Sequence, residues 1–71
     1  MFADLLQKAR DEAGMTQEEL AQKVKVTREY ISLLERGKRT PTILVFIRLA
    51  RALDRTPADL IQEVEKMMGK K

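Results

Sequence analysis

One stretch of the chain decides the fold: residues 16–36, which read TQEELAQKVKVTREYISLLER and are followed by Gly37. Thr16 and Thr27 can each cap the amino end of a helix, because a threonine hydroxyl accepts a hydrogen bond from a free backbone N–H of the first turn. Glu19 lies three residues after Thr16 and completes a capping box. Gly37 can take the left-handed conformation that ends a helix. The stretch therefore predicts a helix-turn-helix unit over about residues 16–36.

Three more helices are expected around this unit. Apolar residues recur at spacings of three, four and seven over about residues 2–13, 42–53 and 57–68. Pro57 suits the first position of the last of these helices. We therefore expect an all-α fold, a compact five-helix bundle that forms one domain over the whole chain. The residues expected on the buried stripes are Phe2, Leu5, Leu6, Ala9, Ala13, Leu20, Ala21, Val24, Ile31, Leu34, Ile43, Phe46, Ile47, Ala50, Leu53, Leu60, Ile61, Val64, Met67 and Met68.

The composition excludes several classes of function. The chain has 71 residues, of which 44% are hydrophobic, and it contains no cysteine and no histidine. The usual ligands of a metal site and the usual bases that activate a nucleophile are therefore missing. Ser32 is the only serine and has no histidine to activate it. We expect a protein that is not an enzyme and uses no metal, no cofactor and no evident small-molecule ligand.

Targeting signals are also missing from the sequence. No apolar run approaches the roughly 18 residues that a membrane span requires. The first residues lack the pattern of a signal peptide. We expect a cytoplasmic protein, prokaryotic or phage-like, that does not enter the membrane.

Positive charge is concentrated in the middle of the chain. Residues 1–22 carry two basic and five acidic side chains, residues 23–55 carry nine basic and three acidic ones, and residues 56–71 carry three of each. A basic block between acidic and neutral flanks is typical of a surface that binds a polyanion. The alternative is that these charges only solvate exposed helix faces.

The second helix of the unit, over residues 27–36, has an apolar and a polar face. At 100° per residue, Ile31 and Leu34 mark the buried face. Five residues lie away from this buried face: Arg28, Glu29, Ser32, Leu33 and Arg36. Glu29, Leu33 and Arg36 point outward, Ser32 lies at the edge of the outward face, and Arg28 is exposed in the first turn. A helix that enters the major groove of DNA needs such an anchored stripe and outward hydrogen-bonding groups near its amino end. The helix is therefore a candidate recognition helix.

Four segments together carry a resemblance to a known family. They read GMTQEELA at residues 14–21, TREYIS at residues 27–32, LERGKRTP at residues 34–41 and LARAL at residues 49–53. In this combination the chain resembles the Xre/Cro/phage-repressor helix-turn-helix family over about residues 4–61. The resemblance implies a five-helix domain of the phage-repressor type that binds double-stranded operator DNA, usually as a twofold dimer, and regulates transcription.

The resemblance also implies roles for individual residues. The positions expected to contact bases are Thr27, Arg28, Glu29, Ser32 and Leu33. The positions expected to contact backbone phosphates are Thr16, Gln17, Lys25, Tyr30, Arg36, Lys38 and Arg39. Arg10 and Glu35 match a structural ion pair between the first and third helices. The alternative for the phosphate contacts is an ordinary solvated helix start and loop, and for Tyr30 it is packing at the edge of the domain.

Two departures from the family pattern lie in the helix-turn-helix unit. Lys25 stands where the family often has glycine, so a non-glycine residue is expected to adopt a left-handed conformation, at a cost of about 1 kcal/mol. Leu33 stands where relatives commonly carry a polar side chain. Leu33 either contacts a thymine methyl group or is a loosely packed surface leucine.

A third departure suggests a dimer interface. Leu44 and Val45 occupy positions that are usually polar, which leaves the fourth helix apolar around much of its girth. With the helix over residues 57–68 they suggest a self-association surface. Its expected members are Leu44, Val45, Val64, Met67 and Met68. The alternative is that Met67 and Met68 close the domain's own core.

Two functions of different classes follow. The first is a homodimeric, sequence-specific and repressor-like regulator of transcription, which binds a palindromic operator with the helix over residues 27–36 in the major groove. The second is a helical interaction module, for example an antitoxin-like one, that binds protein or RNA and keeps the fold without reading operator DNA. The sequence specifies neither the operator nor the direction of regulation.

Overall fold

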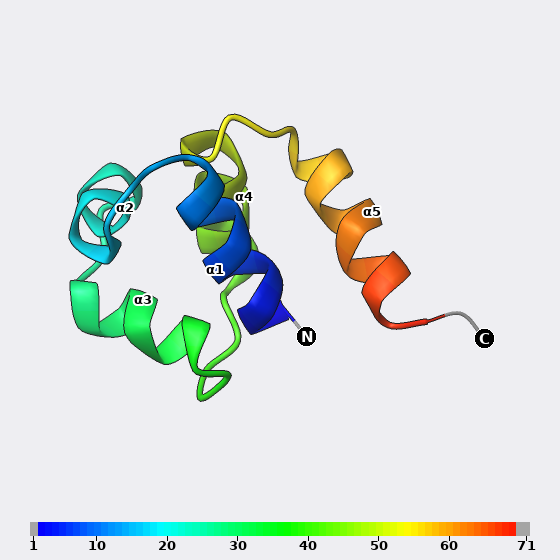
Figure 1. The fold of residues 1–71 in the computed structure, drawn as a ribbon, viewed down its shortest axis with the longest axis horizontal. Helices are drawn as coiled ribbons and strands as arrows, with labels where there is room; N and C mark the ends of the chain where they lie inside the picture. Colours follow the sequence, from blue (N-terminus) through cyan, green and yellow to red (C-terminus); the bar gives the residue numbers. More distant parts are fainter. Residues whose placement is uncertain (1, 70–71) are drawn as a thin grey trace.

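The computed structural model describes residues 2–69 and contains five helices in that range. Their arrangement is shown in Figure 1. In chain order the helices are α1 (Phe2–Glu12), α2 (Gln17–Val24), α3 (Arg28–Glu35), α4 (Ile43–Ala52) and α5 (Pro57–Met67). No strand occurs in the described part of the chain. The expected all-α, five-helix architecture is confirmed.

Four of the five helices begin at a threonine. The hydroxyl groups of Thr16, Thr27, Thr42 and Thr56 each accept the backbone N–H of the residue three positions later, at 3.0–3.2 Å. At α2 the carboxylate of Glu19 also accepts the backbone N–H of Thr16, at 2.9 Å, which completes the predicted capping box. Each cap satisfies a donor that the helix itself cannot pair. The starts of the helices are therefore fixed by local sequence.

The core lies where α1, α2, α3 and α4 meet. Its buried members are Leu6, Ala9, Leu20, Ala21, Val24, Ile31, Leu34, Leu49 and Leu53. Fully burying a leucine or isoleucine side chain contributes roughly 1.5–3 kcal/mol, so this cluster holds α2 and α3 firmly against the other two helices. This packing fixes α2 and α3 relative to each other.

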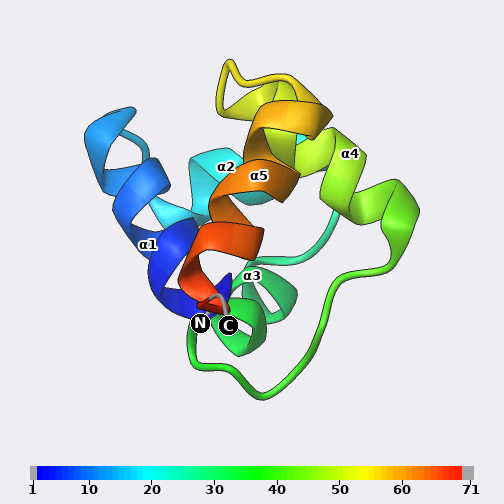
Figure 2. The same cartoon turned by 90° about the vertical axis from the view of Figure 1, so that its right-hand side faces the viewer.

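The last helix, α5, is attached on the outside of α1 and α4. Figure 2, which looks onto α5, shows it lying over the space between those two helices. A second, smaller cluster joins the three through Leu5, Ala50 and Leu60. Arg55, in the turn before α5, adds ion pairs to Glu12 of α1 and Glu63 of α5. The face of α5 that points away from this attachment is open.

Several residues expected in the core lie outside it, and one core residue was not expected. Ile43 is 69% exposed, because it is the first residue of α4 and no other element covers that end of the helix. Ala13 is exposed because α1 ends at Glu12, one residue before it. Leu49 is fully buried, which shows that the buried face of α4 is rotated from the predicted stripe.

The apolar stripe predicted on α5 is also only partly correct. Leu60 is buried, but Ile61, Met67 and Met68 are exposed. The reason is that α5 packs along one narrow face, whereas its apolar residues extend around the helix and past its carboxyl end. The alternative that Met67 and Met68 close the domain's own core does not describe this structure.

Candidate nucleic-acid interface

The turn between α2 and α3 is very short. Lys25 ends α2 in the left-handed conformation, at φ 67° and ψ 46°, which confirms the conformation expected for it. Its backbone N–H donates to the carbonyl of Ala21 at 2.8 Å, and that of Val26 donates to the same carbonyl at 3.0 Å. These bonds end α2, and only residues 25–27 separate it from α3.

The candidate recognition helix α3 is anchored on one side and open on the other. Ile31 and Leu34 are buried in the core, and Glu35 is buried beside them. Arg28 and Glu29 are exposed, and Ser32 and Leu33 are partly exposed. Within residues 2–69, neither Arg28 nor Glu29 takes part in an ion pair. Their charged groups are therefore available to a partner that approaches this face.

Two residues near the amino end of α3 also stabilise the fold. The Oγ1 atom of Thr27 accepts the backbone N–H of Tyr30 at 3.1 Å. A hydroxyl that accepts in this way still carries one proton to donate. Tyr30 is partly buried and packs against the core. The ring of Tyr30 thus has the packing role that the sequence left as an alternative, and the hydroxyl of Thr27 serves first as a cap.

A basic loop follows α3 directly. Gly37 has φ 72°, and a Cβ built on it would meet nothing closer than 3.9 Å, so backbone conformation rather than space favours glycine there. The backbone N–H of Lys38 donates to the carbonyl of Leu33 at 2.9 Å and closes the end of the helix. The loop exposes Arg36, Lys38 and Arg39. Their positive charges therefore stand beside the open face of α3.

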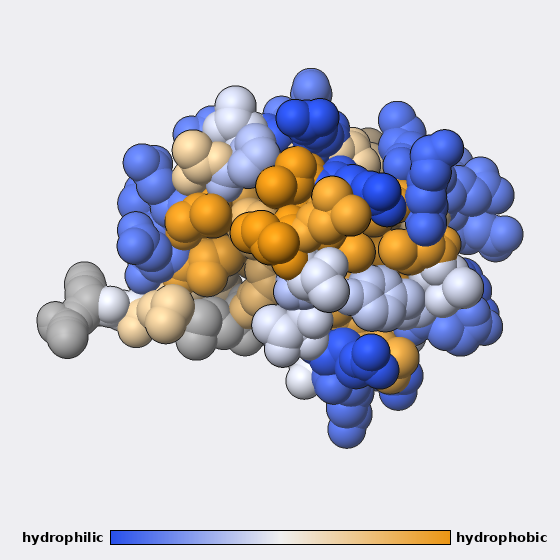
Figure 3. Space-filling view, turned by 180° about the vertical axis from the view of Figure 1, so that it is seen from behind, coloured by the Kyte–Doolittle hydropathy of each residue, from blue (hydrophilic) through white to orange (hydrophobic). Residues whose placement is uncertain are grey.

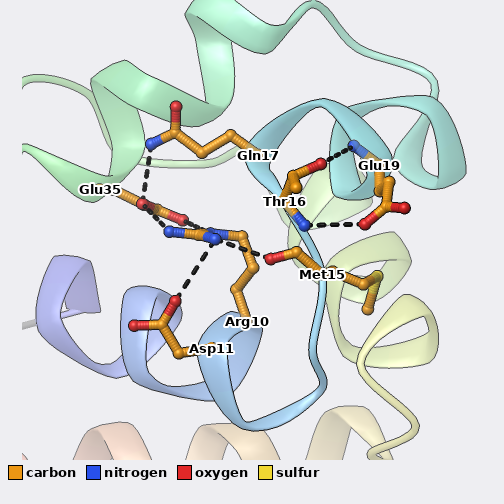
Figure 4. Close-up of polar contacts among 7 residues, drawn as sticks. All are labelled: Arg10, Asp11, Met15, Thr16, Gln17, Glu19 and Glu35. Carbon is orange, nitrogen blue, oxygen red and sulfur yellow. Dashed lines mark hydrogen bonds and ion pairs between the residues drawn. The ribbon is translucent and has the colours of Figure 1, made fainter.

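A partly buried polar network joins α1, α2 and α3, as Figure 4 shows. Arg10 donates to both oxygens of the Glu35 carboxylate, from Nε to Oε2 at 2.6 Å and from Nη2 to Oε1 at 3.1 Å. Its Nη1 atom donates to the carbonyl of Met15 at 2.7 Å. The structure thus brings Arg10 and Glu35 together as the resemblance implied, and it adds the loop before α2 to the network.

The charge of Arg10 is stabilised in this network. The hydrogen bond to Glu35 is the main cause that raises the pKa of Arg10 above its ordinary value; burial acts against it, and the charges of Glu35 and Asp11 add to it. The side chains of Arg10 and Glu35 are only 12% and 4% exposed. Losing one member would leave the other charged and buried, which is costly.

Gln17 lies in an arrangement that the sequence did not predict. It is the first residue of α2 and was expected to contact phosphate, but its Nε2 atom donates to Oε1 of Glu35 at 2.9 Å. No local signal could have indicated this contact, because it depends on how α2 crosses α3. Gln17 is therefore attached to the same carboxylate as Arg10.

A separate apolar surface lies on α4 and α5. Figure 3 shows hydrophobic side chains gathered across the face opposite to that of Figure 1. Leu44 is 55% exposed and Met68 is 66% exposed. A hollow of about 520 Å³ between the loop after α3, α4 and α5 is lined by Ile43 and Ile61 among others. Val45 and Val64, in contrast, are partly buried and pack against the two core clusters.

Comparison with known proteins identifies this arrangement. A family model described as helix-turn-helix matches residues 6–60. The chain belongs to the helix-turn-helix family. Over 51 residues it is 49% identical to an uncharacterized HTH-type transcriptional regulator of Methanothermobacter thermautotrophicus. The matched stretch covers 72% of this chain and 74% of that protein. It is thus a member of a family of transcriptional regulators and not of an enzyme family.

Solved structures of helix-turn-helix proteins show the same fold. The restriction-modification controller protein C.AhdI from Aeromonas hydrophila superposes with a TM-score of 0.79 at 36% identity, over 83% of this chain and 89% of that one. The biofilm regulator SinR, in complex with DNA, superposes with a TM-score of 0.78 at 29% identity, over 86% and 98%. In residues 2–69 of this helix-turn-helix protein, no helix has the length and hydropathy to cross a bilayer.

Proposed function

We propose that the chain is a repressor-like transcription regulator that recognises a specific double-stranded DNA sequence by placing α3 in the major groove. The observation that carries this proposal is the layout of α3: one face is fixed in the core, while the other presents exposed charged groups beside a basic loop. A major groove about 12 Å wide admits a helix, and its base edges are read by hydrogen bonds.

The outward residues of α3 suit contacts to bases. Arg28 can donate two hydrogen bonds to O6 and N7 of a guanine, and Glu29 can accept from N4 of a cytosine or orient Arg28. Thr27 and Ser32 can donate or accept, and Leu33 can meet a thymine methyl group. All five lie on the open side or at the amino end of the helix. Such contacts specify sequence, whereas contacts to the backbone position the protein.

The residues proposed to contact phosphates flank this helix on two sides. Thr16 and Gln17 lie at the amino end of α2, where free backbone N–H groups favour an anion. Arg36, Lys38 and Arg39 lie in the loop after α3. Lys25 and Tyr30 complete the proposed set. The similarity to SinR, whose structure contains DNA, supports this mode of binding.

We further propose that two copies associate through the apolar surface on α4 and α5 and bind a palindromic operator. The proposed contacts centre on the exposed Leu44, Met67 and Met68, with Ile43 and Ile61 beside them. Val45 and Val64, which the sequence suggested, support this surface from beneath. In a twofold dimer, two recognition helices about 34 Å apart would meet half-sites one turn apart.

Selection of bound sites from a pool of random duplexes tests the proposal. The expected product is an inverted repeat with half-sites about one turn apart. Binding to it should weaken by roughly 10³–10⁵ between 50 and 200 mM salt, since a dimer of this kind makes about 6–10 phosphate contacts. Recovery of a single, asymmetric site would contradict the dimer, and failure to enrich any site would contradict sequence recognition.

A second candidate function is a helical module that binds protein or RNA. The exposed apolar side chains of α4 and α5 favour it, because such surfaces mark contacts with other macromolecules. The same assay separates the two candidates. Absence of duplex binding even at 50 mM salt would support the interaction module.

A further inference from the structure

We propose that Glu35 is a positioning residue for DNA binding, because its carboxylate holds the Gln17 amide at the amino end of α2 in a fixed place relative to α3. This inference rests on the proposed function, in which Gln17 contacts a backbone phosphate. It assigns to Glu35 a task beyond stabilising the fold.

The contacts around Glu35 form a single junction. Its Oε1 atom accepts from Gln17 at 2.9 Å and from Arg10 at 3.1 Å, and its Oε2 atom accepts from Arg10 at 2.6 Å. Arg10 also donates to the carbonyl of Met15, in the loop that precedes α2. One carboxylate therefore ties α1, the start of α2 and the last residue of α3 together (Figure 4).

The charges at the junction are compatible with an approaching phosphate. An unpaired carboxylate beside Gln17 would repel the anion, but here Arg10 neutralises Glu35 through two hydrogen bonds. A primary amide has two N–H donors. Glu35 accepts one of the two N–H groups of Gln17, so the other remains to donate to a phosphate. Because the side chain is already held in one rotamer, this contact costs less conformational entropy.

The junction also sets the spacing between the two groups of proposed phosphate contacts. Gln17 opens α2, and Glu35 closes α3 immediately before the basic loop that begins at Arg36. Backbone contacts on both sides of a recognition helix determine its register in the groove. A tie between Gln17 and Glu35 therefore fixes how the two sides are placed with respect to each other.

A double-mutant cycle tests this role without leaving a buried charge. In the background Arg10→Met with Glu35→Leu, the ion pair is replaced by apolar side chains, a change that buried pairs often tolerate. In the wild-type background, Gln17→Ala should weaken binding to the selected duplex roughly tenfold, the low end for one charge-assisted hydrogen bond. In the apolar background the same substitution should change affinity by less than about twofold, since Gln17 is no longer held.

Three controls separate positioning from a general effect. Gln22→Ala, an exposed glutamine on the same helix, should change affinity little in both backgrounds. Gln17→Ala should leave the salt dependence unchanged because Gln17 carries no charge, whereas Arg39→Ala should lower the salt slope by about 0.9. In a background of Arg10→Met with Glu35→Gln, no charge is left buried and an amide oxygen remains to accept from Gln17, so Gln17→Ala should again weaken binding measurably. If the fully apolar background fails to fold, absence of a penalty in this second background contradicts the positioning role.

The outcomes distinguish this inference from the proposed function. If the wild type binds its duplex and Gln17→Ala has the same cost with and without Glu35, the positioning role is overturned while the function stands. The positioning role is also overturned, and the function again stands, if the apolar background binds the duplex as tightly as the wild type. If the wild type binds no duplex, the proposed function is wrong and the positioning role falls with it.

Discussion

At the scale of single residues, the open face of α3 depends on a few side chains whose environments differ sharply. Arg28 is exposed and has no ion-pair partner in residues 2–69, whereas Arg10, a residue of the same type, is almost enclosed and held by Glu35. A guanidinium without an internal partner can direct its fork of donors to a ligand. Arg28 is for this reason the residue in which specificity should be most easily measured.

Replacing Arg28 by alanine should reduce affinity for the selected site by about 1–3 kcal/mol and relax the preference at one base pair. Fluorescence anisotropy with the selected and a random duplex measures both quantities. Arg51→Ala, which removes an exposed arginine from α4, is the matched control and should show no loss of specificity. An equal loss on both duplexes would mean that Arg28 contacts a phosphate.

At the scale of elements, the turn between α2 and α3 carries measurable strain. Lys25 has φ 67° although it is not a glycine. Left-handed backbone costs most residues roughly 1–2 kcal/mol. Asp54, after α4, has φ 62°, but aspartate adopts this conformation more readily because its short side chain can hydrogen-bond locally.

Replacing Lys25 by glycine should therefore raise the free energy of unfolding by about 0.5–1 kcal/mol, after the greater entropy of glycine in the unfolded chain is subtracted. Urea denaturation followed by circular dichroism measures this change. Asp54→Gly is the matched control, and its free energy of unfolding should rise by less. A loss of stability in Lys25→Gly would show that its side chain makes a contribution larger than the strain.

Much of the fold could be predicted because its determinants are local. The caps at Thr16, Thr27 and Thr56 and the left-handed Lys25 follow from residues within one turn of each position. The open face of α3 followed from helical periodicity in the same way. Local patterns of this kind predict where a helix begins and ends, and for α3 they also predicted which face is buried.

What could not be predicted depends on how helices meet. Leu49 is buried and Ile43 exposed because of the way α4 lies on its neighbours. The periodicity of α4 does not single out this face, because the helix is apolar around much of its girth. The bond between Gln17 and Glu35 likewise joins residues from different helices. The open side of α3 was therefore predicted from the sequence, and the contacts of its residues to DNA stay a prediction. Of the supporting network, only the pair of Arg10 and Glu35 was predicted.

At the scale of the whole molecule, two surfaces of different chemistry are separated. The basic loop and α3 form one, and the apolar side chains of α4 and α5 form the other. The loop from Arg36 to Pro41 links them, since Pro41 lines the apolar hollow that α4 and α5 border. Two copies that meet through the apolar surface would therefore keep their basic loops close to the shared axis.

Replacing Leu44 by glutamate should shift the chain toward monomer, because a charge would have to be buried in the contact between copies. Sedimentation velocity over a range of concentrations measures this shift. Gln22→Glu, which introduces the same charge at an exposed position of α2 outside the apolar surface, should leave the association unchanged. An unaltered dimer in the Leu44 variant would remove this residue from the interface.

If two copies pair as proposed, the exposed methionines and isoleucines of α4 and α5 have a consequence for control. A single copy offers one recognition helix, so firm occupancy of two adjoining half-sites requires two copies at once. If these copies pair only weakly in solution, the amount of bound DNA at low abundance rises with the square of the protein level. A gene governed in this way would respond steeply to the concentration of the protein. The rates at which the protein is made and lost would then serve as the signal.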